Sequence, residues 1–421
     1  MWCKPITLSF NESMKRQYAL GTFLLLICSA VSGGNILKEA KEAIKNGSNL
    51  EQTETKLLEA IKTEDNVYKK LDFYYYAALL NRKINDQENE KLYLKQAYDT
   101  ARFFNSIFSV FHHMGNYDSI VNHLQSERKI RKYRQKALRL LEPYQENLLN
   151  GGKFYFMKHD FARAYDFFDC YLKATDKGFF TTTSQDRQAL LVEKISRWAT
   201  SCGYKLQDPK KVLAYSEGAL GDSAKRHFIY EYRAKAYLQM RDTASWLNNL
   251  KEGLRCNPDY SYFFASLTDY LNASQRYDEA LQLADTMLSI RPRNTFFWYA
   301  KSVVLMNLKR YEECITAADS AIAYDSIYMY AYYNKGLAFC NLAVNMSDSA
   351  AAHINQEDYQ DLRQRSVAYY AQALRPMEIV RVLAPKDTLR WAQPLYRIYL
   401  NLNMGAQFAQ IENILKNFKN K

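Results

Sequence analysis

Apolar residues recur along this chain at the spacing of one helix face. Steps of three, four or seven residues separate the members of four groups: Phe264 and Leu271; Ala280, Ala284 and Met287; Trp298 and Leu305; Cys314, Ala318 and Ala321. Such steps place side chains on one side of an α-helix. No run of alternating β-branched residues competes with this pattern, and glycine and proline lie mostly at the ends of the helical stretches. The pattern predicts an all-α chain.

A longer period groups these helices in pairs. The segment Arg276-Tyr277-Asp278-Glu279-Ala280 returns 34 residues later as Arg310-Tyr311-Glu312-Glu313-Cys314. Within each unit, small residues would let the two helices pack closely while large ones fill the groove to the next pair. The pattern resembles the tetratricopeptide repeat, whose helix–turn–helix units stack to bury their apolar faces. The resemblance implies a right-handed α-solenoid of about ten helix pairs with a concave groove for other molecules.

The same period divides the chain. Counting in both directions predicts regular units over 193–343 and divergent, similar helix pairs over 34–192. The unit that opens with Tyr332 and Phe339 has its second helix late, which predicts an insertion at 344–368. The last repeat helix and an atypical capping pair are expected over 369–421, since terminal repeats tend to diverge.

The N-terminal segment 1–32 reads as a signal peptide. Lys15 and Arg16 form a basic region, 19–27 is apolar, and Ala30-Val31-Ser32 is a small-x-small cleavage site before Gly33. A signal peptide that begins at Met14 fits this pattern better than one that begins at Met1. In that case the first thirteen residues would be a misassigned extension. The apolar run is too short to span a bilayer comfortably, and no transmembrane span is predicted in the mature chain. The alternative is an ordinary first helix of the solenoid.

Cys28 is a candidate for lipidation after cleavage. The residue before it is Ile27, whereas a lipobox has a small residue there, so the lipid anchor is the weaker of the two export hypotheses. Removal of 1–32 leaves five cysteines, an odd number with no CxxC pair, so they are interpreted as packing residues. Free thiols fit an oxidising compartment less well, which keeps a cytosolic location open.

Every Asp-Ser and Asp-Thr pair is followed by an aliphatic residue or methionine. This pattern resembles the O-glycosylation acceptor of one group of Gram-negative bacteria, which modify exported proteins. The alternative is that aspartate, serine and threonine favour helix caps and turns. Ser349 is the acceptor that the sequence favours, because it falls in the insertion, where an exposed loop is expected.

The formal net charge is +12; because 1–32 holds three basic residues and one acidic one, the remainder carries +10. One expected helix contributes a basic stripe against a single acid, Glu127. Its members are Arg128, Lys129, Arg131, Lys132, Arg134, Lys136 and Arg139. The stripe is either a solvated face or a contact for an anionic envelope surface. Nucleic acid is not expected, since no platform for bases accompanies it.

Aromatic residues recur at position 2 of successive units, and position 5 adds more in the last two. They are Phe228, Tyr262, Phe296, Tyr299, Tyr330 and Tyr333. In tetratricopeptide arrays these positions line the concave face, so the resemblance implies an aromatic ladder in the groove. Such rings offer large contact area at low entropy cost, which suits peptide or glycan recognition. The alternative is packing between repeats.

Catalytic chemistry is not indicated. The sequence has no HExxH, GxSxG, phosphate loop or dinucleotide fingerprint, and the neighbours His112 and His113 would point about 100° apart on a helix. No cofactor or metal is expected. The predicted function is a non-catalytic scaffold or adaptor of a bacterial cell envelope, exported to the periplasm or associated with the outer membrane, with a protein or peptide partner. The alternatives are a lipid-anchored surface receptor for glycan or nutrient and a cytosolic regulatory solenoid.

Overall fold

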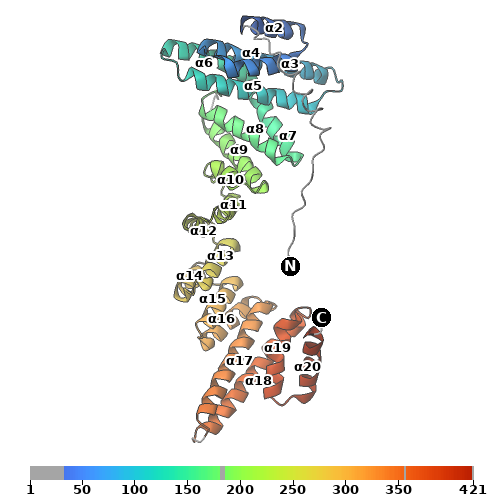
Figure 1. The fold of residues 1–421 in the computed structure, drawn as a ribbon. Helices are drawn as coiled ribbons and strands as arrows, with labels where there is room; N and C mark the ends of the chain where they lie inside the picture. The colour runs from blue at the N-terminus through green and yellow to red at the C-terminus, as the bar shows by residue number, and fades with distance from the viewer. Residues whose placement is uncertain (1–32, 181–184, 355–356, 420–421) are drawn as a thin grey trace, which may run out of the picture. The chain divides into compact units, whose positions relative to one another are not determined.

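The computed structural model describes residues 33–180, 185–354 and 357–419, which are helical almost throughout (Figure 1). The described ranges contain no strand, which confirms the all-α prediction. The signal segment 1–32 and the lipidation candidate Cys28 lie outside them. Packing divides the chain into two compact units, Met1–Asp222 and Ser223–Lys421, and each is described by itself.

In the first unit, helices adjacent in the chain pack as pairs, among them α2/α3, α4/α5, α7/α8 and α9/α10. The helix α6 packs on α5 and belongs to no pair. The elements are α2 (Gly33–Asn46), α3 (Leu50–Thr63), α4 (Val67–Tyr93), α5 (Thr100–Val121), α6 (Glu127–Leu141), the 3₁₀ turn η1 (Glu142–Tyr144), α7 (Gln145–Met157), α8 (Phe161–Asp176), α9 (Gln185–Lys205) and α10 (Pro209–Ser216).

The second unit continues as helix pairs, α11/α12 through α19/α20, each packed on the next. Its elements are α11 (Arg226–Gln239), α12 (Thr243–Cys256), α13 (Ser261–Ala273), α14 (Tyr277–Ile290), α15 (Thr295–Asn307), α16 (Tyr311–Tyr324), α17 (Met329–Ala352), α18 (Tyr359–Leu383), α19 (Thr388–Asn401) and α20 (Gly405–Lys419).

The turns inside the pairs repeat the 34-residue period in backbone conformation. Gln207, Arg241, Gln275 and Lys309 stand 34 residues apart, and all four are left-handed, with φ between 55° and 59°. In each turn the following residue donates its amide to the carbonyl five residues earlier, at 2.8–3.0 Å. This bond closes the helix in the way that a Schellman motif does. These four turns are therefore structural copies of one another.

The positions that the repeat assigns to small residues are buried, as predicted. Ala280, Ala284, Cys314, Ala318 and Ala321 have no exposed surface. Small side chains here let the second helix of each unit lie close to its neighbours, which is the close packing that stacking requires. The interpretation of Cys314 as a packing residue is confirmed, and burial raises the pKa of its thiol to about 12.

The insertion at 344–368 is not a loop, and this expectation was wrong. Residues 344–352 and 359–368 lengthen two helices instead, so that α17 has 24 residues and α18 has 25, where α15 has 13. Ser366 joins the two by donating its hydroxyl to the carbonyl of Ala343 at 2.9 Å. The extra residues continue the helical ladder of both partners, which satisfies their backbone groups at no cost in loop closure.

Candidate functional site

The predicted aromatic face consists of Phe228, Tyr262, Phe296, Tyr299, Tyr330 and Tyr333, and the last four form one connected group. The ring of Tyr299 on α15 lies 6.3 Å from that of Phe296 and 5.7 Å from that of Tyr330 on α17. Arg390 on α19 places its guanidinium 5.2 Å from the ring centres of both Tyr330 and Tyr333. Side chains from α15, α17 and α19, the first helices of three successive pairs, thus make one continuous surface, which we term the C-terminal aromatic group.

Phe228 and Tyr262 form a second, smaller group around Tyr260. The ring centre of Tyr260 lies 6.3 Å from that of each of them. His227 lies 4.1 Å from Phe228 and 4.7 Å from Tyr260, measured between ring centres. Glu231 accepts a hydrogen bond from the Tyr260 hydroxyl and forms an ion pair with Lys235, whose ammonium lies 2.6 Å from the carboxylate. The six predicted rings therefore fall into two clusters, and their place in a concave groove stays a prediction.

Sequence reasoning missed three members of these clusters. Tyr260 and Tyr328 both precede the first helix of a unit, at the same position of the 34-residue period, so the period could have identified them. Tyr328 contacts Tyr299 and Tyr330 at 5.5 and 5.9 Å between ring centres. Arg390 lies beyond the extended hairpin, where the period no longer applies, and no sequence signal marks it.

Four tyrosines of this face have a raised pKa and remain neutral hydrogen-bonding groups at physiological pH. Burial raises the pKa of Tyr328 to about 12, and burial followed by the hydrogen bond to Glu231 raises the pKa of Tyr260 to about 12. Burial also raises the pKa of Tyr299 and of Tyr333. Arg390 stays cationic, since its hydrogen bond to Asp387 raises its pKa further. The face can therefore offer ring surfaces, neutral hydroxyls and one fixed positive charge.

The basic stripe of α6 divides into two sets of side chains. Lys129 donates to the hydroxyl of Tyr68 at 2.8 Å, and Lys136 lies 3.4 Å above the ring of Tyr75. Arg134 pairs with the buried carboxylate of Asp118 at 3.2 Å. The other members are exposed and have no hydrogen bond or ion pair among the described residues. These are Arg128, Arg131, Lys132 and Arg139.

A cavity of about 300 Å³ opens between α5 and α8 in the first unit. Phe108 and Phe179 form apolar parts of its wall, and His112, Asp166 and Lys173 bring polar groups to it. Withdrawal of water raises the pKa of Asp166 and lowers that of His112. The sequence did not point to this cavity, because these helices belong to the divergent pairs, where the period gives no alignment.

The adjacent histidines have different environments. His113 is buried and hydrogen-bonds Glu54 of α3 at 2.6 Å, whereas the ring of His112 stacks on Phe108 at 6.1 Å. Within the described ranges, no three histidine, cysteine or carboxylate side chains are placed to hold a metal ion. No helix among the described residues is both long and apolar enough to cross a membrane.

Ser349 lies within α17 and is half-buried, so its expected position in an exposed loop was wrong. Other Asp-Ser and Asp-Thr pairs have structural roles. Asp99 and Asp242 cap α5 and α12, each accepting the amide of the residue three positions later at 2.9 and 3.0 Å. These caps account for part of the recurring pattern. Glycosylation of Ser349 stays a prediction, and an acceptor there would have to be modified on a helix surface.

Solved chains that this chain is similar to include three tetratricopeptide repeat or MamA proteins. A double mutant of MamA RS-1 shares 17% identity, covering 48% of this chain and 97% of that one, with a TM-score of 0.34. The C-terminal part of a TPR repeat-containing protein from Cytophaga hutchinsonii shares 14%, over 64% and 94%, with a TM-score of 0.41. YrrB, a TPR protein with an unusual peptide-binding site, shares 14%, over 47% and 100%, with a TM-score of 0.28. No protein-family model matches the sequence, and no curated protein is significantly similar to it.

The fold is established by stacked helix pairs whose turns repeat every 34 residues. It is a tetratricopeptide-type α-solenoid. The aromatic face of this solenoid belongs to the first helices of its regular units, α11, α13, α15 and α17.

Proposed function

We propose that this solenoid is a non-catalytic scaffold or adaptor that binds an extended peptide segment of a protein partner along its aromatic face. The observation that carries the proposal is the C-terminal aromatic group, in which α15, α17 and α19 each contribute to one surface. Tyr330 is 41% exposed and Phe228 44%, so rings in both clusters are open to a ligand.

The spacing of the rings suits an extended chain. Neighbouring ring centres in the C-terminal aromatic group lie 5.5–6.3 Å apart. Side chains on one side of an extended peptide recur every two residues, which is roughly 6.6 Å. Successive peptide side chains could therefore meet successive rings.

The rings are also held in place before any ligand arrives. Tyr299 touches Phe296, Tyr328 and Tyr330, so few rotamers remain open to it. A surface fixed in this way loses little conformational entropy when it binds, and tyrosine gives a large contact area with few torsions. Arg390 adds a charge that would favour a carboxylate in the ligand.

The proposal predicts that peptides selected on the full chain from a displayed random library bind the C-terminal aromatic group. For such a peptide, Tyr299→Ala/Tyr333→Ala should raise Kd by about tenfold or more, because truncating central aromatic contacts removes over 1 kcal/mol of binding free energy. Fluorescence anisotropy with the labelled peptide measures this.

Tyr324→Ala is the matched control, since Tyr324 is 48% exposed and lies at the end of α16, outside the aromatic groups. It should leave Kd unchanged. The single variant Tyr330→Ala provides a test with little risk to the fold, and far-UV circular dichroism verifies each variant. Selected peptides that bind folded Tyr299→Ala/Tyr333→Ala and Tyr330→Ala as tightly as the unaltered chain would refute binding at this face.

We propose further that the chain acts in the cell envelope after export, in the periplasm or at the outer membrane. The support is the order of a basic region, an apolar segment and a small-x-small site in 1–32. N-terminal sequencing and intact mass of the protein from its own cells should give a mature chain that begins at Gly33. A lipid on Cys28 would favour the anchored receptor instead, and an uncleaved N-terminus would favour the cytosolic solenoid.

A further inference from the structure

We infer that the outer face of α6 and the hollow beside its first turn form a docking surface for an anionic phospholipid membrane. This inference goes beyond peptide binding, which uses the second unit. It concerns only α4, α5 and α6 of the first unit. The surface combines a row of free cations with exposed apolar side chains, and the two lie next to each other.

The row of cations follows from the helical spacing of α6. Arg128, Lys132 and Arg139 are separated by four and seven residues, so they lie along one side of the helix, with Arg131 beside them. At 1.5 Å per residue the row is about 16 Å long. The opposite side of α6 buries Ala137, Leu140 and Leu141 against the rest of the unit.

The position of these four cations is not explained by contacts within the protein. All are exposed, and none has a hydrogen bond or ion pair within the described part of the chain. The one carboxylate on the helix is Glu127, at its first residue. The three other basic residues of α6 interact with Tyr68, Asp118 and Tyr75 of the same unit. The outer row therefore presents four charges to whatever approaches it.

The hollow lies where α4 begins, α5 ends and α6 begins. Val67 and Tyr68 line it and are both 42% exposed, although the Lys129 ammonium covers one face of the Tyr68 ring. Ile120 and Leu124 are further apolar lining. Lys70 and Lys129 bring ammonium groups to the same hollow. Apolar groups bordered by lysines match the membrane interface, where apolar atoms enter the acyl boundary and ammonium groups remain at the headgroups.

Other polyanions fit this surface less well. Binding to single-stranded nucleic acid relies on free aromatic faces, but the ring of Tyr68 is covered by Lys129 at 4.5 Å and that of Tyr75 by Lys136. An acidic protein would be expected to insert anchors into a desolvated pocket at the centre of its interface. The centre of the outer row is the polar Gln135, on a convex single helix. A membrane requires neither a pocket nor an aromatic platform, only charge and a shallow apolar contact.

The test is binding of the full chain to vesicles in a sedimentation assay. Vesicles of phosphatidylglycerol and phosphatidylethanolamine are compared with zwitterionic phosphatidylcholine vesicles, and a labelled DNA duplex is a third probe. The unaltered chain should bind the anionic vesicles at about tenfold or more lower lipid concentration than the zwitterionic ones, since basic side chains near the surface are attracted to anionic headgroups. Arg128→Glu/Lys132→Glu/Arg139→Glu should abolish this preference.

The control is Arg293→Glu/Arg363→Glu/Arg375→Glu, which makes the same change in net charge at exposed residues of the second unit. It should keep at least half of the preference. All chains retain 1–32, so any contribution from that segment is common to them. An equal loss in the control would mean that net charge alone acts, and a preference that survives in the α6 variant would also overturn the inference. So would binding to the duplex that is tighter than to anionic vesicles and is lost in the α6 variant.

Discussion

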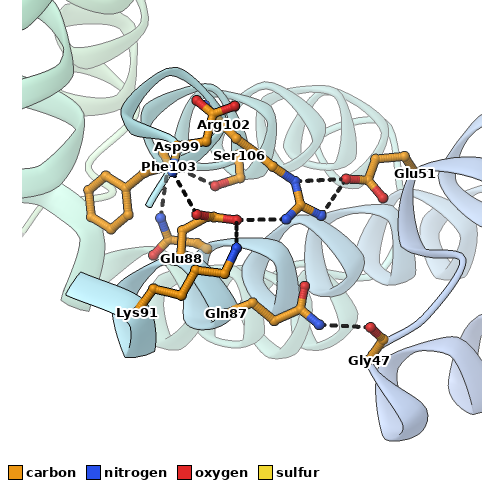
Figure 2. A network of polar contacts seen from close by, with 10 residues as sticks. Gly47, Glu51, Gln87, Glu88, Lys91, Asp99, Arg102, Phe103 and Ser106 are labelled. Carbon is orange, nitrogen blue, oxygen red and sulfur yellow. Dashed lines mark hydrogen bonds and ion pairs between the residues drawn. The ribbon is translucent and has the colours of Figure 1, made fainter. Parts of the chain in front are cut away.

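Replacing Glu88 with alanine will destabilise the first unit by about 1.5–3 kcal/mol, the range expected when hydrogen bonds between charged groups are lost. Glu88 has no exposed surface, and three donors surround its carboxylate (Figure 2). They are the Lys91 ammonium at 2.8 Å, the Arg102 guanidinium at 2.7 Å and the Asp99 amide at 2.9 Å. Without the carboxylate, these donors lose a shared acceptor, and water reaches Lys91 and Arg102 only in part, since their side chains are 42% and 34% exposed.

The effect should extend across three helices. Arg102 of α5 also binds Glu51 of α3, at 3.0 and 2.6 Å, so the guanidinium connects α3, α4 and α5 (Figure 2). Because a solenoid unfolds in parts, amide hydrogen exchange is a sharper measurement than a single melting curve. We expect protection to fall in α3, α4 and α5 and to remain in α13–α16. Glu90→Ala on the exposed side of α4 is the control, with a change within about 0.5 kcal/mol.

The same carboxylate predicts a pH dependence with a definite sign. Burial alone would raise the pKa of Glu88, but hydrogen bonds from Lys91, Asp99 and Arg102 outweigh it and lower the pKa from 4.5 to about 2. Because the pKa of Glu88 is lower in the folded state than in the unfolded one, the ionised carboxylate stabilises the fold above pH 4.5. This stabilisation is lost as the pH falls toward 2. Unfolding of Glu88→Gln should lack this part of the acid dependence. A Glu88→Gln chain as stable as the unaltered one at pH 7, with the same slope below pH 4.5, would contradict this account.

The 34-residue period predicted what depends on stacking and little else. It identified the small residues that are buried, because these repeat with the helix pairs. It did not predict the form of the insertion, since a count of residues cannot tell a loop from two lengthened helices. Ser366 bonds across the hairpin in place of a loop.

Features made by contacts between non-repeating residues were beyond the sequence. Arg390 reaches the tyrosines of another helix pair, and the donors to Glu88 come from its own helix α4, from α5 and from the residue before α5. The basic stripe was predicted as one surface, but three of its seven members interact with Tyr68, Asp118 or Tyr75 of the same unit. Which basic side chains of one helix find a partner depends on the residues that other helices place against them. The sequence of that helix alone does not contain this information.

Gly203→Ala should destabilise the chain by about 1–3 kcal/mol, although alanine is the better helix former. Gly203 lies in α9, where α10 passes against it. An added Cβ would come within 2.6 Å of the Val212 nitrogen and 2.7 Å of the Lys211 carbonyl carbon, both backbone atoms of α10. Backbone cannot rotate away as a side chain can, so α10 must shift. The carbonyl of Gly203 also accepts the Asp208 amide that closes the turn, at 3.0 Å.

Gly115→Ala is the control, because it makes the same change in a helix where the added Cβ has room. Gly115 lies inside α5, and an added Cβ there meets no atom within 4 Å. Since glycine costs about 0.5–1 kcal/mol relative to alanine in a helix, this variant should be stabilised by that amount. Urea unfolding and hydrogen exchange of α9 and α10 measure both changes. Opposite signs at the two glycines would show that close approach of two backbones, and not helix propensity, selects glycine at 203; stabilisation of both would disprove it.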